Sequence, residues 1–119
     1  MTTQHQLDYQ PNSQHIQVLV DGVTVADTNS SILLYETGHP PRYYIPHADI
    51  DMQFLTAVDK QTHCPYKGDA SYYNVVVNNE TYAGIAWTYP NPIPDAAQLQ
   101  GTIAFWPDKD ERIQVLVDK

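Results

Sequence analysis

The chain has 119 residues, a formal charge of -8 from 14 acidic and 6 basic residues, and 1 cysteine. Because an acidic surface repels phosphate backbones and anionic lipid headgroups, we expect neither nucleic acid nor a membrane as a partner. A lone cysteine can form neither an intramolecular disulfide nor a multi-cysteine zinc cluster, and the 5 histidines are scattered along the chain. We therefore predict no metal and no cofactor.

The N-terminal stretch is polar and lacks the basic start and apolar middle of a signal peptide. No apolar run reaches the roughly 18 residues of a membrane-spanning helix. We therefore expect a cytoplasmic protein, with a polar tail over residues 1–15 and a single β domain over residues 16–119. A chain of this length can bury roughly two-thirds of the surface that its unfolded state exposes.

Runs of β-branched and alternating apolar residues predict a mainly β fold, a small single-domain stack of antiparallel sheets with one short helix. The strongest hairpin signal is Asp21-Gly22, because glycine tolerates the positive φ of a type I′ turn. Strands are expected on both sides of that turn and shortly after it, over residues 16–20, 23–27, 31–35 and 42–45.

The second half of the chain predicts two more hairpins, one around residues 78–80 and one around residues 107–110. Residues 94–99 predict the one helix, because Pro94 suits a first turn and Gly101 suits a helix end. Residues 52–55 fit either a strand or a helical turn. The strands of the two hairpins are expected over residues 71–77, 81–88, 102–106 and 112–117.

The hexapeptide Ile-Gln-Val-Leu-Val-Asp occurs twice, at residues 16–21 and 113–118. The segments between the two copies show no further self-similarity, which argues against a duplicated domain. Two readings stay open. Two amphipathic strands could use the same residues independently, or the two ends of the chain lie in one sheet, where they could be neighbours.

Three stretches combine aromatic rings with cationic or reactive side chains, at residues 36–44, 62–73 and 86–92. The chain also holds 9 tyrosines against 2 phenylalanines. Because a buried phenol needs a hydrogen-bond partner, a core built only for packing would favour phenylalanine. We predict one aromatic, partly cationic pocket for an anionic or planar polar small molecule, with the ligand-binding candidates Arg42, Tyr43, Tyr44, His63, Tyr66, Lys67, Tyr72, Tyr73, Trp87 and Tyr89.

Two cations carry the chemistry of this predicted pocket. Arg42 could stack on a ring or grip a carboxylate, or it could form an ion pair with Glu36. Lys67 precedes a glycine, so turn N–H groups and its ammonium could share one anion, or it could pair with Asp69 in solvent. In a strand, neighbouring tyrosines point to opposite faces, so only part of the aromatic set can face the pocket.

Cys64 and His63 are the catalytic candidates, since a nearby cation would lower the pKa of a thiol and make it a nucleophile. Adjacent residues of an extended chain point apart, however, and a lone cysteine is most often a small buried hydrophobe. Asp49-Ile50-Asp51 could hold Mg²⁺, but more simply it solvates the start of a strand.

These motifs resemble the uncharacterised family catalogued as domain of unknown function 427, over roughly residues 16 to 107. The resemblance implies a compact fold like the β-tent of B-type methionine sulfoxide reductases. Zinc on paired cysteines, common in those relatives, does not carry over to a chain with 1 cysteine, and no catalytic residue is transferred. The residues that carry the resemblance are Val20–Asp27, Glu36–Gly38, Pro40–Tyr44, Thr62–Gly68, Ala70–Tyr73, Ala86–Pro90 and Ala104-Phe105.

Two further classes of function stay open, and the sequence does not decide whether the chain is an enzyme. One is an enzyme that uses Cys64 or His63 in hydrolysis, redox chemistry or nucleotidyl transfer. The nucleotidyl-transfer label gains no support from the residues, because the Gly-Ser start of such a transferase is missing. The other is a homo-oligomeric interaction module, a homodimer joined through the edges of its strands.

Overall fold

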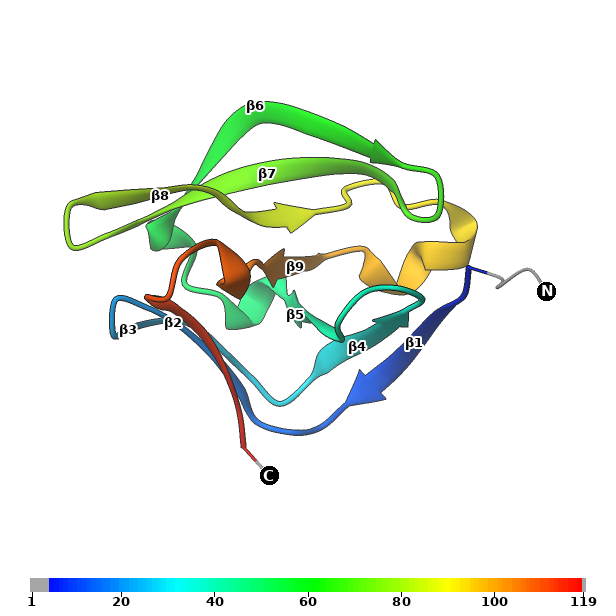
Figure 1. Ribbon diagram of the computed structural model, residues 1–119, viewed down its shortest axis with the longest axis horizontal. Helices are drawn as coiled ribbons and strands as arrows, with labels where there is room; N and C mark the ends of the chain where they lie inside the picture. The colour runs from blue at the N-terminus through cyan, green and yellow to red at the C-terminus, as the bar shows by residue number, and fades with distance from the viewer. Residues whose placement is uncertain (1–4, 119) are drawn as a thin grey trace.

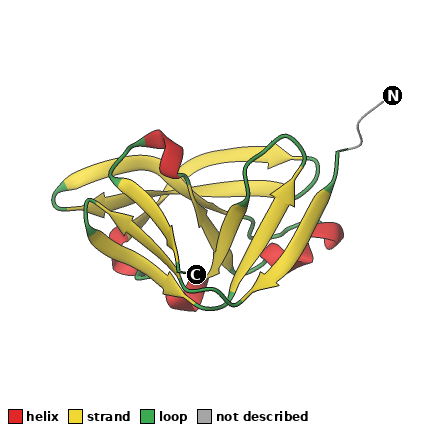
Figure 2. Ribbon diagram, turned by 60° about the horizontal axis from the view of Figure 1, so that its bottom comes forward, coloured by secondary structure: helices red, strands yellow, loops and turns green. Residues whose placement is uncertain are grey.

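The computed structural model describes residues 5–118, and in this range the chain is a mainly β structure (Figure 1). Helix occurs only as short 3₁₀ turns between the strands (Figure 2). The strands are β1 (Leu7–Asn12), β2 (Ile16–Val20), β3 (Val23–Thr28), β4 (Ser31–Glu36), β5 (Arg42–Pro46), β6 (Leu55–Cys64), β7 (Gly68–Val77), β8 (Glu80–Thr88), β9 (Thr102–Phe105) and β10 (Ile113–Val117).

The strands form two antiparallel sheets, which confirms the predicted fold class. One has seven strands in the order β1-β4-β5-β9-β8-β7-β6, and the other has three in the order β10-β2-β3. The predicted helix at Pro94–Leu99 is a 3₁₀ segment, η3, with a kink at Ala96, where φ is -114° and ψ is 21°. No helix in residues 5–118 has the length and apolar run that crossing a membrane requires.

Two of the three predicted hairpins are confirmed. β2 and β3 join through Asp21 and Gly22, and β7 and β8 join through Asn78 and Asn79. All four residues have positive φ, between 49° and 78°. Positive φ at both central positions is the mark of a type I′ turn, whose twist matches that of the flanking strands.

The third predicted hairpin is wrong, because its two strands lie in different sheets. β9 pairs with β5 and β8, whereas β10 pairs with β2. The burial of the two strands gives the reason. All four residues of β9 are buried, as a central strand requires, while β10 alternates between inward and outward residues.

Two edge strands were not predicted. β1 lies within the segment expected to be a polar tail over residues 1–15, of which residues 1–4 lie outside the described part. β1 pairs with β4 over its whole length. β6 covers residues 55–64 and pairs with β7. β6 is rich in polar, exposed residues and shows no apolar alternation, whereas β1 alternates only over residues 7–10, with Leu7 and Tyr9 half-buried.

The two copies of the repeated hexapeptide lie side by side in the three-stranded sheet. β2 and β10 are neighbours, with Ile16 opposite Val117, Val18 opposite Val115, and Val20 opposite Ile113. The reading that places the two copies in one sheet as neighbours is therefore correct for the copies themselves, whereas β1, which precedes the first copy, lies in the other sheet.

The core divides into two clusters. The first, which we call the aliphatic cluster, joins the inner faces of the two sheets and includes Ile16, Val18, Val25, Val75, Ile85, Ile103 and Phe105. The second, the aromatic cluster, lies within the larger sheet and under η3 and comprises Leu34, Tyr44, Ala70, Tyr89, Ala96, Leu99 and Ala104, with Tyr9, Cys64, Tyr72 and Trp87 packed around them.

Candidate functional site

A pocket of about 260 Å³ lies beside the aromatic cluster. Its walls come from segments far apart in the sequence, because β4, β5, β7 and β8 lie in one sheet and the turn at Lys67 folds over them. The lining residues are Leu34, Glu36, His39, Pro40, Arg42, Tyr44, Lys60, Lys67, Tyr72, Trp87, Tyr89 and Trp106.

Six of the predicted ligand-binding residues line this pocket: Arg42, Tyr44, Lys67, Tyr72, Trp87 and Tyr89. The other four do not. Tyr43 and Tyr73 pack against the aliphatic cluster. Tyr43 is next to Tyr44 on β5 and Tyr73 is next to Tyr72 on β7, and neighbouring residues of a strand face opposite sides of the sheet. His63 and Tyr66 lie at the surface, with 69% of the His63 side chain and 45% of Tyr66 exposed.

Arg42 lies at the start of β5, with its guanidinium over the indole of Trp87, 5.1 Å from the ring centroid. Its Nη1 donates a hydrogen bond of 3.2 Å to the carbonyl of Phe105. Within residues 5–118 Arg42 makes no ion pair, so the alternative of a pair with Glu36 is wrong. The guanidinium therefore keeps unused donors beside an aromatic face.

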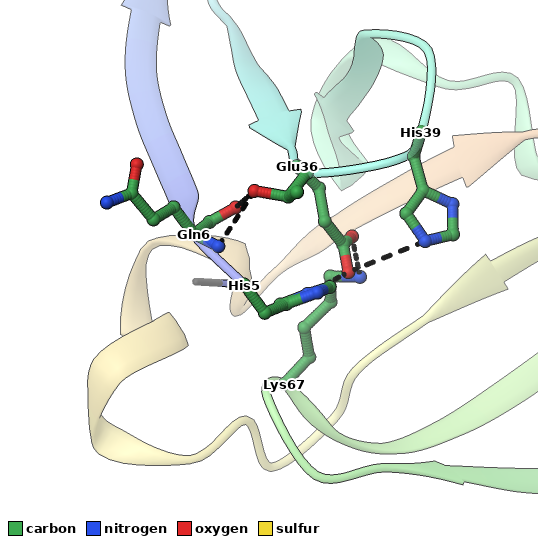
Figure 3. A network of polar contacts seen from close by, with 6 residues as sticks. His5, Gln6, Glu36, His39 and Lys67 are labelled. Carbon is green, nitrogen blue, oxygen red and sulfur yellow. Dashed lines mark hydrogen bonds and ion pairs between the residues drawn. The ribbon is translucent and has the colours of Figure 1, made fainter. Parts of the chain in front are cut away.

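Glu36 forms its ion pair with Lys67 instead. The Nζ of Lys67 donates to Glu36 Oε1 at 2.6 Å, and the two side chains are only 9% and 10% exposed. His5 and His39 approach the other carboxylate oxygen at 2.9 and 3.9 Å, so three cationic or potentially cationic side chains surround one carboxylate (Figure 3). The alternative of a solvent pair between Lys67 and Asp69 is wrong.

The backbone fixes the position of Lys67. Its N–H donates to the carbonyl of Cys64, and its own carbonyl accepts from the N–H of Ile93. The next residue, Gly68, has φ of +120°, and a Cβ there would lie 3.2 Å from the Asn91 carbonyl oxygen. A side chain at this position would be strained and would crowd residues 91–93, so glycine allows the turn to pack closely against them.

Charge and burial set the protonation of the pocket. Burial disfavours ionised Glu36, but hydrogen bonds and charge from Lys67, with the help of His5 and His39, outweigh it and lower the pKa of Glu36. Burial raises the pKa of Tyr44, against the charge of Lys67 and a hydrogen bond with Trp87, and burial also raises the pKa of Tyr89. The pocket thus combines an ionised carboxylate with neutral phenols.

Cys64 and His63 are not brought together. His63 Nδ1 lies 2.7 Å from Asp69 Oδ1 at the surface, whereas Cys64 packs against the aromatic cluster. No hydrogen bond or ion pair in the described residues joins Cys64 to a histidine. That Cys64 or His63 serves an enzyme remains a prediction.

The two aspartates of the possible Mg²⁺ site, Asp49 and Asp51, already accept hydrogen bonds from other side chains. Asp49 accepts a hydrogen bond of 2.7 Å from Thr28, and Asp51 accepts one of 2.8 Å from Gln53. Across residues 5–118, no three His, Cys, Asp or Glu side chains gather as metal ligands would. Asp49 thus connects η1 (His47–Asp49) to the end of β3, and Asp51 stabilises a local turn.

Sequence reasoning missed several residues of the site. Lys60 extends from β6 over the ring of Tyr72, with 4.5 Å between Nζ and the centroid, although it reads as a surface charge. Trp106 follows β9 and is 40% exposed, with Lys109 over its ring. Glu36 and His39 could have been found, since both lie in the same aromatic stretch as Arg42.

The family described as a domain of unknown function (DUF427) matches this chain over residues 8–119. No curated protein matches the chain. The match starts within β1, so it covers the strand that the sequence reading assigned to a tail.

Proposed function

The chain belongs to the DUF427 family, and from that premise we propose that it binds a small molecule that carries an anionic group on a flat ring system. The pocket beside Trp87 is the site. Lys67 and Arg42 bind the anionic group, and the faces of Tyr72 and Trp87 contact the ring.

The observation that carries the proposal is the hydrogen bonding of Lys67. An ammonium group has three N–H donors, and a buried charge is stable only when it is well paired. Lys67 is 7% exposed, yet its side chain donates only to Glu36 within the described chain. Two N–H donors of the buried Lys67 ammonium thus stay available, and the guanidinium of Arg42, which has no ion pair within residues 5–118, lines the same pocket. This concentration of positive charge occurs in a protein whose formal charge is -8.

The aromatic residues restrict the shape of the ligand. Trp87, Tyr72 and Trp106 line the pocket, and cations already lie over all three rings, from Arg42, Lys60 and Lys109. Aromatic rings that line a pocket can stack on planar groups of a ligand. A volume of about 260 Å³ lies just below the usual range for ligand sites, which begins at about 300 Å³, and so suits one compact small molecule.

Tryptophan fluorescence is a direct test. The chain has 2 tryptophans, Trp87 and Trp106, and both line the pocket, so the whole tryptophan signal reports on this site. We would titrate nucleoside monophosphates, aromatic carboxylates and sugar phosphates, and measure melting temperature in parallel. We expect at least one of the aromatic anions to change the fluorescence and raise the melting temperature.

Arg42→Gln is the decisive variant, because Arg42 has no ion pair in the described part of the chain whose loss would disturb the fold. We expect affinity to fall roughly tenfold to a hundredfold, the worth of a charged hydrogen bond. The matched control is Arg112→Gln, whose arginine lies over Tyr82 and outside the pocket; it should bind as the wild type does. If no compound changes either signal, or if Arg42→Gln binds normally, the proposal fails.

A further inference from the structure

Strand β10 is an edge of the three-stranded sheet and differs from the other sheet edges. β1 contains Pro11, β6 has an irregular register between Ala57 and Gln61, and β3 is irregular opposite residues 18 and 19. Proline and bulges are the usual devices that stop an edge from pairing with another chain. β10, with the sequence Ile-Gln-Val-Leu-Val, has no proline, no charge and no register shift.

The sequence of β10 already pairs with itself within this molecule. β2 has the same five residues and lies antiparallel to β10, with the first residue of one strand opposite the last of the other. The central pair is therefore valine opposite valine, Val18 and Val115. A second β10, turned by a two-fold rotation about Val115, would repeat every one of these side-chain pairs on the free edge.

The backbone of β10 is in phase for such a partner. At its two ends, Asp21 N donates to Arg112 O and Asp118 N donates to His15 O, each at 2.9 Å. In an antiparallel ladder these bonded pairs alternate, so the even-numbered residues of β10 bond to β2 and the odd-numbered ones face the open edge. The odd-numbered residues are those that the two-fold rotation would bond across the interface.

One of these groups is already used, because Ile113 N donates to the Asp110 carbonyl at 3.0 Å. The N–H and C=O of Val115, the N–H of Val117 and the C=O of Ile113 remain for a partner. They allow four backbone bonds, two between the Val115 residues and two from Val117 to Ile113.

The side chains at this edge are incompletely covered. Val115 and Val117 face the aliphatic cluster but are only half-buried, and a hollow of about 120 Å³ opens beside Val115. On the outer face, Leu116 is 44% exposed. A second β10 would cover the valines and place Leu116 opposite Gln114, as Leu19 now lies opposite Gln114 within one chain.

The charges at the ends of the strand also match. The rotation about Val115 places Arg112 of one copy, which pairs with Glu80 and Asp110 in its own chain, opposite Asp118 of the other, which lies 3.2 Å from His15. Opposite charges in directly facing positions stabilise a strand pair, whereas like charges would oppose it.

We propose that two copies of this chain associate through β10, in antiparallel register about Val115, to form a continuous six-stranded sheet in the order β3-β2-β10-β10-β2-β3. The partner is a second copy rather than another protein, because the register, backbone phase and end charges all satisfy one two-fold axis. This proposal stands independently of the ligand site.

The first test is sedimentation equilibrium of the wild type and two variants. Val115→Pro removes an N–H that faces the open edge and leaves the ladder to β2 intact. Val115→Ala gives up the same valine side chain but keeps the N–H. We expect the wild type to be a dimer. The association constant should fall for Val115→Ala, and it should fall at least about tenfold further for Val115→Pro.

The second test is a cross-link that does not depend on how proline is tolerated. In a Cys64→Ser background, Gln114→Cys protein is mixed with Leu116→Cys protein and oxidised. The register makes these positions a non-bonded pair with Cα atoms about 4.5 Å apart, within reach of a disulfide. We expect a mixed covalent dimer, and little from either protein alone. A wild type that stays monomeric near about 1 mM, a dimer that Val115→Pro leaves intact, or the absence of the mixed disulfide would overturn the proposal.

Discussion

The two core clusters differ in chemistry as well as in place. The aliphatic cluster joins the two sheets and consists largely of valine and isoleucine, which need no hydrogen-bond partner. The aromatic cluster, by contrast, contains Tyr44 and Tyr89 and is bordered by Tyr9, Tyr72 and Trp87. The aliphatic cluster is thus built mostly from residues that only pack, with Tyr82 as a buried exception, whereas the residues of the aromatic cluster more often carry polar groups.

This difference separates stability from the proposed binding. The pocket borders the aromatic cluster and receives the buried pair of Glu36 and Lys67, whose burial is costly unless both partners remain. A protein optimised only for stability would fill this region with aliphatic side chains. Three sets of substitutions, taken from the largest expected effect to the smallest, test the division.

Ile103→Ala in the aliphatic cluster should have the largest effect. Ile103 is 0% exposed on a central strand, so truncation leaves a cavity between the sheets. We expect a loss of about 3 kcal/mol in the free energy of unfolding, measured by urea denaturation. Ligand affinity of the folded fraction should not change. A loss below about 1 kcal/mol would mean that the two sheets pack loosely.

Glu36→Gln should cost about 2 kcal/mol at neutral pH, because it leaves the buried Lys67 ammonium without a carboxylate. The pKa of Glu36 is lowered on folding, so its stabilising effect is present above about pH 4.5 and is lost as the pH falls through the lowered value. The unfolding curves of wild type and variant should therefore converge in acid.

The matched control for this pair is Asp69→Asn, which removes the carboxylate from an ion pair with His63 in which both side chains are more than half exposed. It should change stability by less than about 0.5 kcal/mol. The double variant Glu36→Gln with Lys67→Met should recover part of the loss, because it removes the unpaired cation. Equal effects at Glu36 and Asp69 would contradict the importance of burial.

Two tyrosines of the aromatic region should respond oppositely to loss of the hydroxyl. Tyr44 has a hydrogen bond with Trp87, so Tyr44→Phe should lose about 1 kcal/mol. The Tyr9 hydroxyl is buried without a hydrogen-bond partner among residues 5–118, and burial raises its pKa to about 12. Tyr9→Phe should therefore be neutral or slightly stabilising in thermal unfolding. A clear loss at Tyr9 would show that its hydroxyl has a partner in solution.

Local rules were enough for two of the three predicted hairpins and for the type of fold. Asp21-Gly22 and Asn78-Asn79 specify their turns, because few residues adopt positive φ at low cost. Local rules did not reveal β1 and β6, because their exposed polar residues are typical of loops. They also did not reveal which strands β9 and β10 pair with. Partner choice depends on which faces are buried, and that is a property of the assembled sheets.

For the site, the sequence determined that rings and cations are concentrated in three stretches, while only the tertiary structure decided which of them meet. Alternation along a strand turns Tyr44 and Tyr72 toward the pocket and their neighbours Tyr43 and Tyr73 away from it. The pairing of Lys67 with Glu36, rather than with Asp69, arises because the turn at Gly68 buries the ammonium beside the end of β4. A buried charge selects whichever opposite charge the fold brings into contact, and separation along the chain does not predict that choice.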